Sequence, residues 1–274
     1  MKKKILIIGK KGFIGTNLYK FFKEKKTKVH SLSFEDFLNS NKKNIDKFDV
    51  IINCSSNKKF IKNKYKVSND YDLIIAKKII NSKTKLVMLS TRKIYKLKFN
   101  IKESDKKNPI CNYSKNKLLS ECSVEKILIN RTLVLRISNI IGLPNNNKRK
   151  LQNTFSDIFF KMAKRGYIYN NKKIYKDFIS IKKFNEIVFE LIKKNSFGVY
   201  NVSIGKKIYI SQIVSWLNFY NSNKINIIRA KNSFNNHNFT LNNSKLMHKI
   251  KIKNNLSNLK NECLAISRNF FIQK

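Results

Sequence analysis

The 274-residue chain has few of the residues that bind metals or form disulfides. Its four cysteines include no Cys-x-x-Cys pair, and none of its three histidines lies close enough to a cysteine to complete a metal-ligand set. We therefore expect no metal site and reduced thiols, as in a cytoplasmic protein. The first apolar run, Ile5–Ile8, is too short for a signal-peptide core or a membrane span. The sequence thus predicts neither export nor membrane insertion.

Acidic residues are also scarce, because 16 Asp and Glu stand against 59 Lys and Arg, a formal net charge of +43. Such an excess usually indicates a polyanionic partner such as nucleic acid or an acidic membrane. Here the lysines are dispersed over almost every segment among many Asn and Ile residues, as a codon bias toward A and T would produce. We therefore expect no nucleic-acid partner, and RNA binding through the basic surface remains the alternative.

Glycine is rare too, yet three of the seven glycines stand at positions 9, 12 and 15. They follow the β-branched run Ile5–Ile8, which is typical of a buried parallel strand, and precede apolar residues at helical spacing. A strand, this glycine spacing and a helix N-terminus together bind a dinucleotide pyrophosphate. Gly9 permits the tight turn, Gly12 lets the backbone approach the phosphates, and Gly15 lets the helix pack on the strand.

Strands and helices alternate along most of the chain. Apolar runs predict strands at 29–32, 50–52, 86–89, 133–137 and 199–202, and helical spacing predicts helices near 69–81, 113–128, 155–164, 211–220 and 256–270. The segment between the second and third strands is short, so we expect one strand of the usual set to be reduced or missing. The fold class is α/β: a doubly wound parallel sheet of Rossmann type over residues 1–141, rejoined by about 175–203, with a smaller C-terminal substrate-binding lobe within 142–274.

Tyr113 and Lys117 form a Tyr-x-x-x-Lys pair, which a helix places one turn apart on one face. The ammonium lowers the pKa of the phenol, which can then exchange a proton with a substrate oxygen while hydride moves to or from a nicotinamide. The spacing recurs three times elsewhere, but only Tyr113 opens a helix that follows a strand ending in Ser90-Thr91. A hydroxyl there can align the reacting oxygen, so Thr91, Tyr113 and Lys117 are the predicted catalytic residues.

The choice between NADP and NAD depends on the end of the second strand. An acidic residue that binds the adenosine ribose is expected there, but the chain has Ser33, with Glu35 and Asp36 slightly later. Lys10 stands in the glycine loop. Together these residues favour a 2′-phosphate and hence NADP, and NAD remains open.

Stretches along nearly the whole chain resemble the extended short-chain dehydrogenase/reductases, the family of nucleotide-sugar epimerases, dehydratases and reductases. The family's cofactor loop resembles G-K-K-G-F-I-G, its fourth-strand motif D-V-I-I-N-C-S-S, and its hydroxyl-bearing strand L-S-T-R-K-I-Y. The loop and helix with the Tyr and Lys resemble E-S-D-K-K-N-P-I-C-N-Y-S-K-N-K-L-L-S-E, and the segment after the sixth strand resembles L-R-I-S-N-I-I-G. In this chain, K-D-F-I-S-I resembles the family's R-D-F-x-x-V motif. The segment G-V-Y-N-V-S-I-G resembles the late strand that returns to the family's core sheet.

The resemblance implies roles for individual residues. Lys117 would also hold the nicotinamide ribose, and Asn139 would lie near the nucleotide-sugar. With the glycine loop and Ser33, the expected cofactor contacts are Gly9, Lys10, Gly12, Phe13, Ile14, Gly15, Ser33, Asn53, Cys54, Ser55 and Lys117. The expected substrate contacts are Ser90, Arg92 and Asn139. Because Arg92-Lys93 stands where the family's 4,6-dehydratases carry Asp-Glu, the acid and base of elimination are absent, and we expect no dehydration.

The resemblance implies an NAD(P)-dependent enzyme that reduces a 4-keto group or epimerises C4 of a nucleotide-sugar in surface polysaccharide synthesis. The glycine loop and the segment before Tyr113 resemble the dTDP-4-dehydrorhamnose reductase branch, whereas R-x-x-N is more like the epimerases, so both reactions stay open. We expect a cytoplasmic homodimer, with helices 69–81 and 113–128 in a four-helix interface. The alternative is a catalytically altered Rossmann-type protein that binds RNA.

Overall fold

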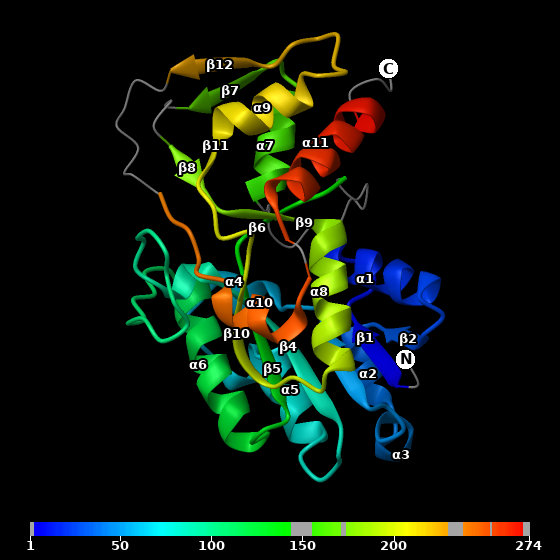
Figure 1. Cartoon of the computed structure of the whole chain (residues 1–274). Helices are drawn as coiled ribbons and strands as arrows, with labels where there is room; N and C mark the ends of the chain where they lie inside the picture. Colours follow the sequence, from blue (N-terminus) through cyan, green and yellow to red (C-terminus); the bar gives the residue numbers. More distant parts are fainter. Residues whose placement is uncertain (1–2, 144–154, 171–173, 230–237, 253, 271–274) are drawn as a thin grey trace.

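The structure is a computed structural model that describes residues 3–143, 155–170, 174–229, 238–252 and 254–270. A larger lobe surrounds a six-stranded sheet, and a smaller lobe of helices and two-stranded sheets lies at one end of it (Figure 1). The chain crosses between the lobes more than once, because the sixth strand of the large sheet follows elements of the small lobe in sequence.

The central sheet is parallel and has the strand order β10-β5-β4-β3-β1-β2. Its strands are β1 (Lys4–Ile8), β2 (Lys28–Leu32), β3 (Val50–Asn53), β4 (Lys85–Thr91), β5 (Thr132–Ile137) and β10 (Gly198–Val202). The classical doubly wound order has one more strand outside β2. Here the short helices α2 (Phe34–Asn39) and α3 (Lys42–Ile45) connect β2 to β3 in place of that strand. The predicted absence of one strand is therefore confirmed.

Helices cover both faces of this sheet (Figure 1). They are α1 (Phe13–Glu24), α8 (Ile181–Lys193) and α10 (Ser244–Ile250) on one face, and α5 (Tyr71–Lys78) and α6 (Asn112–Ile127) on the other. Ile5 and Ile7 of β1 pack toward α1 and α8, whereas Leu6 and Ile8 pack toward α5 and α6. Burial on both faces explains why β1 is apolar from Ile5 to Ile8 rather than alternating. None of the described helices is long and apolar enough to cross a bilayer.

The smaller lobe has its own hydrophobic core. Its helices are α7 (Phe155–Ala163), α9 (Ile210–Leu217) and α11 (Leu256–Phe270). Its strands pair as β7 (Tyr167–Asn170) with β12 (Asn226–Arg229), β8 (Tyr175–Lys176) with β11 (Ile208–Tyr209), and β6 (Asn139–Ile141) with β9 (Phe178–Ser180). Phe159, Phe160 and Leu259 pack together in this core. Since β6 follows β5 directly, the small lobe begins at the carboxyl edge of the large sheet.

Asp177 joins segments of the two lobes where they meet. Its fully buried carboxylate accepts backbone N–H groups from Phe178 at 2.8 Å, Gly205 at 3.2 Å and Leu241 at 2.9 Å. These donors belong to β9, to the turn after β10 and to the segment before α10. One side chain of the K-D-F motif therefore satisfies backbone groups from three separate segments, which fixes the small lobe relative to the sheet edge.

Candidate functional site

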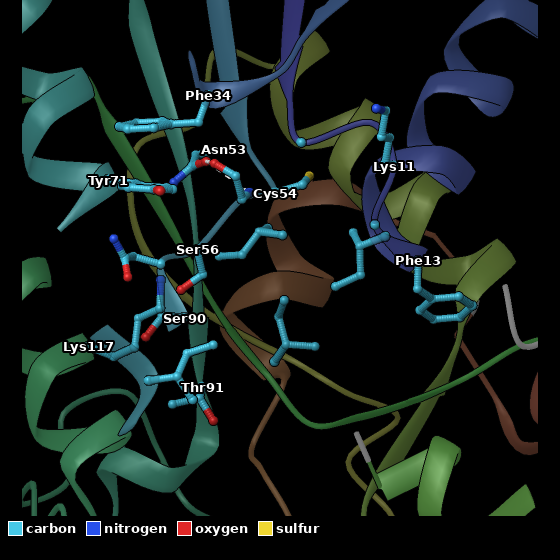
Figure 2. A pocket seen from close by; sticks show the side chains of 18 of the residues that line it. Lys11, Phe13, Phe34, Asn53, Cys54, Ser56, Tyr71, Ser90, Thr91 and Lys117 are labelled. Carbon is cyan, nitrogen blue, oxygen red and sulfur yellow. Dashed lines mark hydrogen bonds between the residues drawn. The ribbon is translucent and has the colours of Figure 1, made fainter. Parts of the chain in front are cut away.

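A cleft of about 1070 Å³ lies at the carboxyl ends of the central strands, where doubly wound folds bind their ligands (Figure 2). It brings together most of the residues that the sequence singled out. The predicted residues that line it are Gly9, Lys10, Gly12, Phe13, Ile14, Ser33, Asn53, Cys54, Ser55, Ser90, Thr91, Tyr113, Lys117 and Asn139. The two that do not line it are Gly15 and Arg92.

The glycine loop is built by close contacts between backbone segments. Gly9 directly follows β1 and has a φ of +89°, and a Cβ there would lie 2.8 Å from the amide nitrogen of Ser55. A Cβ at Gly15 would overlap the carbonyl oxygen of Gly9. Gly15 thus lets α1 pack against the loop from behind, without facing the cleft. At Gly12 a Cβ would make only ordinary contacts, 3.5 Å from the Gly9 oxygen and 3.9 Å from the Cys54 oxygen.

Tyr113 and Lys117 lie in the first turns of α6, on the face toward the cleft. The helix begins in a capping arrangement in which the hydroxyl of Ser114 accepts the backbone N–H of Cys111 at 3.2 Å. The Lys117 side chain reaches the neighbouring helix α5, where its Nζ donates to Oδ2 of Asp72 at 2.8 Å. Lys117 is 5% exposed and Asp72 is 2% exposed, so this ion pair is buried.

The ion pair acts on the protonation states of both catalytic candidates, but burial has the larger effect on Tyr113. Burial raises the pKa of Tyr113, the charge of Lys117 offsets this only in part, and the charge of Asp72 raises it further, so the pKa is raised and not lowered as the sequence predicted. Burial alone would lower the pKa of Lys117, but Asp72 and the Tyr113 phenol outweigh it, so the pKa of Lys117 is raised. Lys117 is therefore a permanent cation beside the phenol, and Asp72 moderates its effect.

Asp72 connects α6 to the end of β3 within the cleft. Its Oδ1 accepts Nδ2 of Asn53 at 2.7 Å, at the end of β3. Oδ1 of Asn53 accepts the backbone N–H of Ser55 at 3.0 Å and its hydroxyl at 2.6 Å. Sequence reasoning missed Asp72, although a carboxylate in the otherwise apolar stretch 71–76 of an acid-poor chain was a signal for it.

We expect Asp72→Asn to lower the pKa of Tyr113, because the variant removes a negative charge that opposes phenolate formation. In a profile of turnover against pH, the limb that reports Tyr113 should move to lower pH by roughly one unit. The matched control is Asp105→Asn, which removes a carboxylate that pairs with Lys98 at the surface and should leave the limb in place. If the pH of this limb were also unchanged in Asp72→Asn, the result would contradict the influence of Asp72 on the pKa of Tyr113.

The two hydroxyls at the end of β4 differ in their availability. Ser90 donates its hydroxyl proton to the carboxylate of Glu121, which also forms a buried ion pair with Arg136 at 2.6 Å. Thr91 accepts the backbone N–H of Lys93 at 3.2 Å, as the cap of the short helix η2 (Arg92–Ile94). An accepting hydroxyl still has its own proton to donate. Of the two cleft-lining hydroxyls, Thr91 is therefore the one that keeps a proton to donate.

The far end of the cleft contains two aromatic residues that sequence reasoning missed. The rings of Phe34 and Tyr71 stack with centroids 3.3 Å apart and an interplanar angle of 9° (Figure 2). Beside them, Ser33 and Asp36 form the capping box of α2, with bonds of 3.0 and 3.3 Å. The hydrogen bonds from Ser33, aided by the charge of Lys10, lower the pKa of Asp36.

The two predicted substrate residues outside β4 lie in different places. Asn139 lines the cleft, and its Nδ2 donates to the backbone oxygen of Asp177 at 3.0 Å. Arg92 does not line the cleft, and its guanidinium carbon lies 4.0 Å from the ring centroid of Phe239. Arg92 therefore lies outside the cleft, next to Thr91 in sequence, and the structure does not place it with the other predicted substrate contacts.

The structure distinguishes Tyr113 from the other tyrosines at the same spacing. Tyr19 and Lys23 lie on α1 outside the cleft, with Lys23 Nζ 5.8 Å from the Tyr19 ring centroid. The Tyr169/Lys173 pair cannot be placed, since Lys173 lies outside the described residues. In the small lobe, Lys224 donates to the backbone oxygen of Asn218 at 2.7 Å instead of facing a tyrosine.

Comparisons with known proteins agree with this architecture. The family described as the RmlD substrate binding domain matches residues 2–165, more than half of the chain. No curated protein matches the chain. A solved UDP-N-acetylglucosamine 4-epimerase from Methanobrevibacter ruminantium M1, in complex with UDP-N-acetylmuramic acid, is similar over 100% of both chains, with a TM-score of 0.82 and 18% identity.

Two further solved structures have the same fold. A dTDP-4-dehydrorhamnose reductase from Clostridium acetobutylicum is 17% identical, with a TM-score of 0.73 over 94% of this chain and 98% of its own. RMD from Pseudomonas aeruginosa, complexed with NADPH, is 15% identical, with a TM-score of 0.73 over 98% of this chain and 97% of its own. At these identities the similarity shows a shared fold.

Proposed function

Since the chain belongs to the RmlD substrate binding domain family, within the extended short-chain dehydrogenase/reductases, we propose that it is an NAD(P)-dependent enzyme acting on a nucleotide-sugar. The proposed reaction is reduction of a 4-keto group or epimerisation at C4, in the synthesis of a surface polysaccharide. One observation carries the proposal: a single cleft is lined by the glycine loop at one side and by Thr91, Tyr113 and Lys117 at the other.

The residues of the cleft fit a dinucleotide cofactor. The missing side chain at Gly12 leaves free the space that a Cβ would fill, so the loop backbone can approach a pyrophosphate. Hydrogen bonds to Asp72 and between the two residues orient Asn53 and Ser55, which line the cleft. Lys117 would hold the nicotinamide ribose. Ser33, together with Lys10, favours a 2′-phosphate. The bound cofactor would supply or accept the hydride.

The side chains of the protein would then transfer the proton and orient the substrate oxygen. In a reduction, Tyr113 gives its phenolic proton to the oxygen that becomes the C4 hydroxyl, and Lys117 stabilises the phenolate that remains. In an oxidation, Tyr113 accepts the proton from that hydroxyl. Thr91 donates a hydrogen bond to the same oxygen and keeps it aligned with the phenol. An epimerase would use both directions in succession.

Purified protein would distinguish the two reactions. We expect it to convert at least one member of a panel of UDP- and dTDP-linked sugars and 4-keto sugars, as measured by chromatography with mass spectrometry. A reductase consumes added reduced cofactor in proportion to product, whereas an epimerase retains its cofactor and needs none added. Absence of conversion across the panel, with cofactor binding confirmed by calorimetry, would contradict the proposed function.

We expect Gly12→Val to remain folded but to bind the cofactor at least about tenfold more weakly, a loss of roughly 1.4 kcal/mol. The valine fits against the protein, because the Gly9 and Cys54 oxygens lie at ordinary contact distances from its Cβ, but it fills the space the pyrophosphate needs. Calorimetric titration with NADPH and NADH measures the affinity, and the thermal midpoint checks the fold. Unchanged affinity would mean that the loop does not hold the phosphates.

A further inference from the structure

The outer edge of β2 ends the central sheet at the position where the classical fold has one more strand (Figure 1). The carbonyl oxygen of Leu32 accepts the N–H of Gly9 at 3.0 Å, so it points toward β1. Successive residues of a strand direct their backbone groups to opposite sides, and Val29 and Ser31 therefore direct theirs away from β1. Neither residue forms a backbone hydrogen bond with any other part of the described chain beyond the β1–β2 ladder. The edge of β2 is thus open.

The opposite edge of the same sheet is closed by side chains. On β10 the N–H of Asn201 donates to Oε1 of Glu103 at 2.8 Å, and the carbonyl oxygen of Val199 accepts Nζ of Lys245 at 2.8 Å. Backbone groups inside a protein are nearly always paired, and open sheet edges are the places where another chain can add a strand. The open edge therefore distinguishes β2 from β10.

A groove of about 440 Å³ runs along the open edge, and it shares only Lys10 with the cleft described above. We call it the edge groove. Its lining includes Lys4, Lys10, Lys23, Lys28, Val29 and Ser31. No carboxylate is among the described residues that line it, and none of its four lysines forms an ion pair with a described carboxylate. The edge groove therefore combines positive charge with unpaired backbone groups.

Two carboxylates lie near the ends of the edge groove. Asp49 accepts the backbone N–H of Lys4 at 2.7 Å. Hydrogen bonds from Ser33, aided by the charge of Lys10, lower the pKa of Asp36. Between these ends, no carboxylate of the described segments interacts with Lys23 or Lys28. These two lysines are therefore the cations of the groove that a ligand can use without displacing an acidic residue.

The lysines flank the open edge on both faces of the sheet. Val29 packs in the core under α1, and Lys23 of α1 lines the groove from that face. Lys28 precedes Val29 and so lies on the opposite face, together with His30, whose ring centroid is 5.4 Å from that of Phe48. A chain lying in the groove would therefore meet a lysine on each side of the sheet.

We propose that the edge groove binds an extended acidic segment of a partner protein, which adds a strand to β2. The backbone of the segment would pair with the outward N–H and C=O groups of Val29 and Ser31. Successive side chains of a strand point to opposite faces, and the lysines lie on both faces, so consecutive Asp or Glu residues fit better than alternating ones. Residues 28–31 span roughly 13 Å, the length of about four residues of such a segment.

Other occupants fit the edge groove less well. The longest acidic run in the sequence is Glu35-Asp36, which lies in α2, so a second copy of the chain has no suitable segment. Pairing of β2 with β2 of another copy would bring like charges together at the shared edge. A phosphate anion would meet the outward carbonyl oxygens of Val29 and Ser31, which repel it. The proposal is independent of the proposed enzyme activity.

The probe is an acetylated and amidated hexaglutamate peptide, titrated calorimetrically into the full-length protein. A second peptide has the same carboxylates but carries methyl groups on its three central backbone nitrogens, which removes their hydrogen bonds. We expect the methylated peptide to bind at least about tenfold more weakly. In hydrogen exchange followed by NMR, the unmethylated peptide should slow exchange of the Val29 and Ser31 amides by roughly tenfold or more. Equal affinity of the two peptides, or unchanged exchange at both amides, would overturn the proposal.

Charge-matched variants test the role of the lysines. Lys23→Gln/Lys28→Gln changes two residues of the edge groove, whereas Lys20→Gln/Lys42→Gln removes the same charge at exposed positions of α1 and α3 outside it. We expect the first double variant to bind hexaglutamate about tenfold more weakly and the second to bind it nearly as the wild type does. Thermal midpoints check that both variants fold. Equal weakening in the two variants would mean that net charge alone attracts the peptide.

A competition experiment distinguishes an acidic peptide from a phosphate ligand. Tripolyphosphate, added at the same ionic strength in place of the peptide, should leave exchange of the Val29 and Ser31 amides unchanged. Protection of these amides by tripolyphosphate would identify a phosphate site and would overturn the proposal, as would equal weakening of hexaglutamate binding in the two double variants.

Discussion

Tyr113→Phe is expected to lower turnover by roughly 10²- to 10⁴-fold, the usual contribution of a positioned proton donor or acceptor. The variant keeps the ring and its packing at the start of α6 and removes only the hydroxyl that faces the cleft. Cofactor affinity and the thermal midpoint should stay close to the wild-type values. Initial rates with a nucleotide-sugar that the wild type converts, together with calorimetry for the cofactor, measure the two effects separately.

The control is Tyr19→Phe, which alters the same Tyr-x-x-x-Lys spacing on α1. Tyr19 packs partly against the core and lies outside the cofactor cleft, so this variant should turn over at nearly the wild-type rate. Full activity in Tyr113→Phe would remove Tyr113 from the mechanism. A comparable loss in Tyr19→Phe would show that the effect comes from altered packing instead of lost proton transfer.

Lys117→Met is expected to destabilise the fold as well as to reduce turnover. The thioether side chain leaves the Asp72 carboxylate buried without its counterion, and removing one partner of a buried ion pair costs about 3–5 kcal/mol. Turnover falls because the phenol loses the cation that lowers its pKa. Urea unfolding gives the loss in the free energy of unfolding, and initial rates give the catalytic loss.

The double variant Lys117→Met/Asp72→Asn separates these two effects. Removing the charge of Asp72 should restore most of the lost free energy of unfolding, because no unpaired charge then stays buried there and the Asn oxygen can still accept the hydrogen bond from Asn53. Turnover should stay low, since the phenol still lacks its cation. A double variant as unstable as Lys117→Met would show that the ion pair is not the cause of the instability.

The glycine loop and the Tyr113/Lys117 pair could be predicted from the sequence because each depends on local spacing. Gly9 and Gly15 are required by backbone contacts within one strand–loop–helix unit. Because the chain has only seven glycines, their regular spacing is easily recognised in the sequence. The buried parallel strands were also evident, since burial on both faces makes β1 and β3 continuous apolar runs.

Features that depend on packing between distant segments were harder to predict. Asp72 faces Lys117 only because α5 and α6 lie side by side on the sheet, and Phe34 likewise meets Tyr71 from a distant part of the sequence. Helix α8, by contrast, has a clear helical repeat in Phe184, Ile187 and Leu191 and was overlooked. The homodimer, the cytoplasmic location and the alternative of RNA binding stay predictions from the sequence.

The most direct test is a single-turnover experiment in which the cofactor-loaded enzyme is mixed rapidly with a nucleotide-sugar that it converts. We expect the absorbance of the nicotinamide to change at the rate of sugar conversion, either as one oxidation in a reductase or as a transient reduction in an epimerase. The same change in Tyr113→Phe should be slower by roughly 10² or more. Conversion of the sugar with the nicotinamide in one redox state throughout would contradict hydride transfer in this cleft.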